Sequence, residues 1–142
     1  MIRRDFVLRL IEQLGAIARA LISGERGEIS RAAAEAALAD AAEQGLGLSL
    51  QTLRALGPQS LVQLFRSGGA IGNSRIALAA AIYRTEAKIA ASSGEASRAT
   101  ACAQKALYLL EQIRSDPVSS EQYSIEQHRS EMLGLLRTSA SA

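Results

Sequence analysis

Apolar side chains recur every three or four residues through the first five turns of the chain, at Phe6, Leu10, Leu14, Ile17 and Leu21. The opposite side carries polar residues, namely Arg9, Glu12, Gln13 and Arg19. This period matches the 3.6-residue turn of an α-helix that has one wet face. The pattern therefore predicts an amphipathic helix from Arg4 to about Ser23.

Glycines, prolines and capping residues divide the rest of the chain into further helices. Ser49 is expected to cap a short helix, and Pro58 to be the first residue of the next one. Asn73 or Ser74 is expected to cap a long helix after the glycine-rich linker "SGGAIGN", and the box-like "SSEQ" at 119–122 to start the last helix. The expected helices after the first span residues 28–44, 50–56, 58–65, 74–91, 95–114 and 120–137.

The composition favours an all-α fold in a single domain of 142 residues. Apolar residues make up 48% of the chain and aromatic residues only 4%, with no Trp, so the core must be built from Leu, Ile and Ala. Alanine is the strongest helix former, and strand-favouring residues are scarce. The net charge is only +2, with cations and anions mixed along the chain, which argues against a dedicated nucleic-acid surface.

A hexapeptide occurs twice, as "GEISRA" at 27–32 and "GEASRA" at 94–99, an offset of 67 residues. When residues 18–39 are placed on 85–106 without a gap, ten of the 22 positions agree. In each copy the glycine suits the end of one helix, the glutamate suits the start of the next, and alanines suit the seam between them. We interpret the two segments as copies of one helix–turn–helix unit.

The offset is close to twice 34, the period of tetratricopeptide repeats. Tyr83, Ala87, Gly94, Ala99 and Ala106 follow the spacing that this family prefers. The chain thus resembles a tetratricopeptide-like helical repeat protein over about 4–44 and 74–114, with a degenerate middle unit at 46–69. It departs from the family in having Ala90 and Ala103 where an aromatic is usual. The alternative is a plain helical bundle in which the hexapeptides agree by coincidence. The opening "MIRRDF" is also similar to a group of short uncharacterised bacterial helical proteins.

The resemblance implies a right-handed stack of antiparallel helical hairpins with six or seven helices. It also implies a partner-binding face on the first helix of each unit, where Arg84 and Lys88 would meet a carboxylate. The alternative for these two cations is a solvated surface. The same face of the first unit holds Leu14, Ile17 and Leu21, which a second copy of the chain could cover in a homodimer. The alternatives for this trio are cover by the last helix or a place in the ordinary core.

Candidate chemistry is sparse. Cys102 lies in the middle of a helix, where a cysteine usually behaves as a small apolar residue, and the sole histidine, His128, is far from it in sequence. We expect no metal, no cofactor and no catalytic residue. The favoured function is a non-enzymatic protein–protein interaction or scaffold module. The alternatives are a nucleic-acid-binding regulator, which would use Arg3, Arg4, Arg9, Arg19, Arg31 and Arg98, or an enzyme of unrecognised type.

The chain start "RRDFVL" resembles a twin-arginine export signal. Charged residues interrupt the apolar stretch that such a signal needs, and the longest apolar run, residues 76–83, is far too short to span a bilayer. The expected location is therefore the cytoplasm, and no membrane partner is expected.

Overall fold

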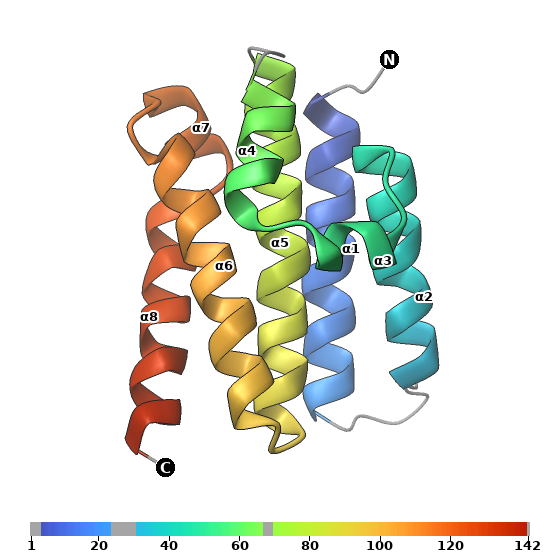
Figure 1. Cartoon of the computed structure of the whole chain (residues 1–142), viewed down its shortest axis with the longest axis vertical. Helices are drawn as coiled ribbons and strands as arrows, with labels where there is room; N and C mark the ends of the chain where they lie inside the picture. Colours follow the sequence, from blue (N-terminus) through green and yellow to red (C-terminus); the bar gives the residue numbers. More distant parts are fainter. Residues whose placement is uncertain (1–3, 24–30, 67–69, 142) are drawn as a thin grey trace.

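The computed structural model describes residues 4–23, 31–66 and 70–141, and these residues form helices and no strand (Figure 1). The prediction of an all-α fold is confirmed. The helices of the described part are α1 (Arg4–Ser23), α2 (Arg31–Ala41), the π-helical turn η1 (Ala42–Leu46), α3 (Leu50–Ala55), α4 (Pro58–Arg66), α5 (Ala70–Ser92), α6 (Ala96–Arg114), α7 (Pro117–Gln122) and α8 (Ile125–Ser141). None of these helices is both long enough and apolar enough to cross a membrane.

Helix α5 is the centre of the molecule. It packs against α6 on one side and α1 on the other, α8 lies against α6, and α2 lies beyond α1 (Figure 1). The connection between α5 and α6 lies at the same end of the molecule as the end of α1 and the start of α2. A tetratricopeptide-like stack of equivalent hairpins stays a prediction, and residues 27–30 of the first hexapeptide lie outside the described residues.

The buried surface of α5 is made largely of alanine. Every residue from 76 to 87 is buried, and the run includes Ala77, Ala79, Ala80, Ala81 and Ala87. Small side chains let neighbouring helix backbones approach closely, so α1 and α6 can both pack against the same helix. Leucines from the surrounding helices complete the core, which explains how a chain with few aromatic residues buries its apolar surface.

The expected linker at 67–73 is shorter than predicted. Helix α5 begins at Ala70, so Asn73 and Ser74 lie inside it and are not at its N-cap position. Gly72 sits in its first turn because α4 passes very close: a Cβ atom there would lie 2.1 Å from the carbonyl oxygen of Phe65. This glycine permits a close approach of two backbones and does not end a helix. Residues 67–69 lie outside the described residues.

The predicted stop at 92–95 is confirmed. Gly94 has the left-handed φ of +78°, and α6 starts just after it. Ser49 and Pro58 also act as predicted, since the Ser49 side chain accepts a hydrogen bond from the Thr52 amide and Pro58 begins α4.

The single helix expected at 120–137 is two helices. Asp116 caps α7 by accepting hydrogen bonds from the amide and the hydroxyl of Ser119, and Pro117 is the first residue of that helix. Ser124, with a φ of +51°, then separates α7 from α8. The start signal is therefore the Asp116-Pro117 pair and not the "SSEQ" box at 119–122.

Candidate functional site: a charged cleft over α5

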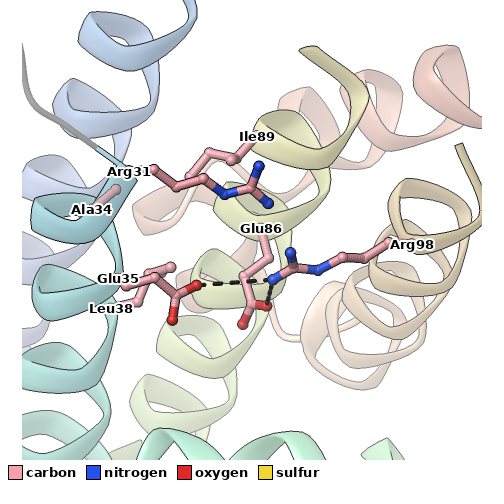
Figure 2. Close-up of a pocket in the computed structure, with 7 residues that line it drawn as sticks. All are labelled: Arg31, Ala34, Glu35, Leu38, Glu86, Ile89 and Arg98. Carbon is pink, nitrogen blue, oxygen red and sulfur yellow. Dashed lines mark hydrogen bonds and ion pairs between the residues drawn. The ribbon is translucent and has the colours of Figure 1, made fainter. Parts of the chain in front are cut away.

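A cavity of about 480 Å³ opens over α5 between α2, α3 and α6. We call it the Glu86 cleft, and it is lined by Glu35, Arg54, Tyr83, Glu86, Arg98, Ala101, Cys102 and Lys105. A second cavity of about 10 Å³ adjoins it and shares Glu35, Glu86 and Arg98 (Figure 2). It is also lined by Arg31, Ala34, Leu38 and Ile89.

Glu86 forms the floor of the cleft and is only 3% exposed. Its carboxylate accepts hydrogen bonds from Arg54 Nε and from Arg98 Nη2, each at 3.2 Å. Figure 2 shows the Arg98 guanidinium reaching from α6 to Glu86 on α5 and toward Glu35 on α2. A buried carboxylate is costly unless opposite charges and hydrogen bonds compensate it, and the two guanidinium groups supply both.

The ion-pair network extends from Glu86 to the other walls. Arg54, on α3, also donates from Nη2 to Glu35 Oε1 at 2.8 Å, and Arg98 Nη2 lies 3.9 Å from the same oxygen. Charged side chains thereby connect α2, α3, α5 and α6 around the cleft. Each guanidinium contacts one carboxylate of α2 and one of α5.

Tyr83 forms a rigid wall next to Glu86. Its hydroxyl donates to the carbonyl oxygen of Leu53 at 2.9 Å, and burial, with the nearby charge of Glu86, raises its pKa to about 12. The Lys105 ammonium lies 5.4 Å from the centre of the Tyr83 ring, within the range of a cation–π contact. Burial, followed by the charge of Glu86, also raises the pKa of the Cys102 thiol.

Arg31 and Arg98 hold equivalent positions in the two hexapeptides, and both contact Glu95, with Arg98 Nη1 lying 3.8 Å from Glu95 Oε2. Arg31 Nη2 lies 2.8 Å from Glu95 Oε2, and its Nη1 donates to the Ser93 hydroxyl at 3.3 Å. Arg31 therefore joins the start of α2 to the connection between α5 and α6, whereas Arg98 reaches Glu86. Both arginines, which the nucleic-acid alternative would use, are held in ion pairs with glutamates. Arg3 lies outside the described residues.

Arg84 and Lys88, the predicted partner-binding cations, lie away from the cleft and face α8. Lys88 Nζ is 2.6 Å from Glu131 Oε2, and Arg84 is only 7% exposed. Burial lowers the pKa of Arg84 to about 10, against the opposing effect of Glu131. In this structure, the carboxylate that these cations face belongs to the chain itself, and Arg84 is not on a solvated surface.

His128 belongs to the same α5–α8 contact. Burial, followed by the charge of Arg84, lowers its pKa to about 4, although Glu131 Oε1 lies 3.8 Å from Nδ1. The imidazole is therefore neutral near pH 7. It does not line the cleft that contains Cys102.

The predicted interface trio is divided. Leu14 is 2% exposed and belongs to the core, as one of the alternatives for this trio expected. Ile17 is half-buried, and the side chain of Leu21 lies outside the part that the structure describes. The trio therefore does not form an open apolar patch. Arg84 and Lys88 likewise do not line an open groove.

Sequence reasoning missed the cleft, although one signal for it was present. In "IYRTEAKIA" the residues three and four positions before and after Glu86 are all apolar or aromatic. A charge on the apolar face of a helix requires partners, so this position predicts a buried ionic contact. Its partners Arg54 and Arg98 come from other helices, and no local pattern identifies them.

Comparisons with protein-family models, with curated proteins and with solved structures find no match for this chain. Among the described residues, no group of three or more His, Cys, Asp or Glu side chains is placed to hold a metal ion. The function must therefore be inferred from the geometry of the Glu86 cleft.

Proposed function

We propose that this chain is a non-enzymatic protein–protein interaction module and that the Glu86 cleft receives a segment of its partner. The observation that carries the proposal is the preformed cleft of about 480 Å³, whose charged walls come from four elements and are held by ion pairs. A site that is rigid before binding loses less conformational entropy when a partner binds. Its mixed apolar and charged lining suits recognition of a peptide.

The reactive groups in the cleft favour binding over catalysis. A cysteine nucleophile requires a thiolate, and the pKa of Cys102 is raised. A tyrosine acid or base works best with a pKa near neutrality, and that of Tyr83 is about 12. The Tyr83 hydroxyl is also engaged by Leu53. We propose the cytoplasm as the location, since the unpaired Cys102 suits a reducing compartment.

A cleft-blocking substitution tests this proposal. Ala101 is exposed on α6 and lines the cleft, so Ala101→Trp fills part of the cavity without entering the core. Ala91→Trp, at an exposed position near the end of α5 that lines neither cavity, is the matched control. Both variants should unfold at temperatures close to that of the wild type.

Affinity capture from native cells should then recover the same protein with the wild type and with Ala91→Trp, and lose it with Ala101→Trp. A partner retained equally by all three baits would contradict a role for the cleft. A second copy of this chain is among the partners that the proposal includes. If the partner is a second copy, light scattering should show an oligomer for the wild type and a monomer for Ala101→Trp.

A further inference from the structure

We infer that the Glu86 cleft recognises an acidic side chain of an extended partner segment and that Lys105 binds its carboxylate. The inference rests on the proposed function and adds the chemistry of the ligand. It assigns a binding role to Lys105, a residue that the sequence patterns did not single out.

The charges of the cleft are balanced except at Lys105. Its lining holds three cations and two carboxylates, so one positive charge is left over. Arg54 and Arg98 both contact Glu86 and Glu35. Lys105 forms no ion pair within the described part of the chain. A partner that supplies one carboxylate would neutralise the cleft.

The position of Lys105 leaves its hydrogen-bond donors available. The ammonium lies over the face of the Tyr83 ring, an electrostatic contact that uses no acceptor atom. The ring cannot turn away, because its hydroxyl is bonded to Leu53 and it is 1% exposed. The three N–H groups of Lys105 can therefore donate to a carboxylate in charge-assisted hydrogen bonds.

The neighbouring wall suits the aliphatic part of an acidic residue. Ala101 lies four residues before Lys105, on the same face of α6, and Cys102 adds a second small apolar side chain. With a volume of about 480 Å³, the cleft has room for more than one side chain. It therefore fits a segment of a partner better than a compact free acid.

A random peptide library displayed on phage is the probe for the test. Selection is carried out on the full chain as wild type, as Lys105→Gln and as Arg66→Gln. Arg66 is an exposed cation on α4 that bonds Gln112 and lines neither cavity, so it is the charge-matched control. Peptides selected on the wild type and on Arg66→Gln should share an Asp or Glu at one position, and those selected on Lys105→Gln should not.

The best peptide and its acid-to-amide twin are then titrated against each protein. A charge-assisted hydrogen bond corresponds to roughly a tenfold change in affinity or more. Either the amide twin or Lys105→Gln should therefore weaken binding about tenfold, and the two changes together should cost little more than one alone. Arg66→Gln should bind within about twofold of the wild type.

The outcomes separate the two levels of the proposal. Peptides without a shared acidic residue, or twins that bind equally well, would overturn the role of Lys105 and leave peptide binding intact. Free N-acetylglutamate that binds as tightly as the peptide would overturn the choice of an extended segment. A library that yields no binding peptide would count against the protein-binding function itself.

Discussion

Substitution of Glu86 by glutamine is the sharpest test of the ion-pair network that shapes the cleft. The amide keeps the size of the side chain and removes its charge. Arg54 and Arg98 would then lose the charged carboxylate at 3.2 Å, although both would still face Glu35. We expect Glu86→Gln to destabilise the fold, because the two guanidinium groups stay partly desolvated without their central acceptor.

The size of the effect follows from the geometry. A hydrogen bond to a charged group contributes about 1.5–3 kcal/mol when it is well buried. Glu86 is 3% exposed, but the side chains of Arg54 and Arg98 are 37% and 36% exposed, so solvent screening lowers each contribution to about 1 kcal/mol. The amide also avoids the cost of burying a charge. The net loss should be about 1–2 kcal/mol, or roughly 3–8 °C in the midpoint of thermal unfolding.

Urea unfolding followed by circular dichroism measures this loss. Glu121→Gln, at an exposed position on α7, is the control and should stay within about 0.5 kcal/mol of the wild type. A double-mutant cycle with Arg98→Gln should give a coupling of about 1 kcal/mol between the two side chains. If Glu86→Gln is as stable as the wild type, or more stable, the network does not hold the walls of the cleft together.

Three further predictions concern glycine packing, pH dependence and thiol reactivity. Gly72→Ala should destabilise the chain by about 1–3 kcal/mol, because its Cβ would meet the Phe65 carbonyl. Gly134→Ala, whose Cβ would lie at an ordinary contact distance of 4.0 Å from the Arg137 side chain, should stabilise it by about 0.5–1 kcal/mol; urea unfolding measures both. The pKa of His128 is about 4 when folded and 6.5 when unfolded, so its stabilising effect is complete above pH 6.5 and is lost as the pH falls toward 4. After allowance for the partial exposure of His128, the free energy of unfolding should fall by about 1–2 kcal/mol over this pH range. His128→Gln should make the free energy of unfolding depend less on pH, and thermal unfolding at several pH values measures both. Cys102 should react with iodoacetamide at least about tenfold more slowly in the native chain than in urea, since it is buried and the pKa of its thiol is raised; equal rates would contradict the structure of this wall.

Local signals in the sequence predicted most of the helices. The period of α1, the cap at Ser49, Pro58 and the left-handed Gly94 all act over a few residues, and the structure confirms these predictions. Gly72 is an exception. The sequence alone does not show whether a glycine ends a helix or permits another helix to approach closely, and at Gly72 only the path of α4 shows that it is the second.

The candidate site depended on contacts between distant segments, which no periodicity specifies. Arg84 and Lys88 have the spacing of an exposed pair on a helix, but α8 packs over them and supplies Glu131. Lys105 appears in sequence as an ordinary solvated lysine. Its place over Tyr83 arises only when α5 and α6 pack together.

Mapping of a selected peptide onto the protein by nuclear magnetic resonance would test the central claim most directly. With the ¹⁵N-labelled full chain and the acidic peptide, the largest amide shifts should fall on α6 around Ala101 and Lys105 and on α5 around Glu86. The amide twin of the peptide should shift the same residues much less at equal concentration. Shifts centred instead on the α5–α8 contact around Arg84 and His128, or spread evenly over the surface, would show that the Glu86 cleft is not where this protein binds its partner.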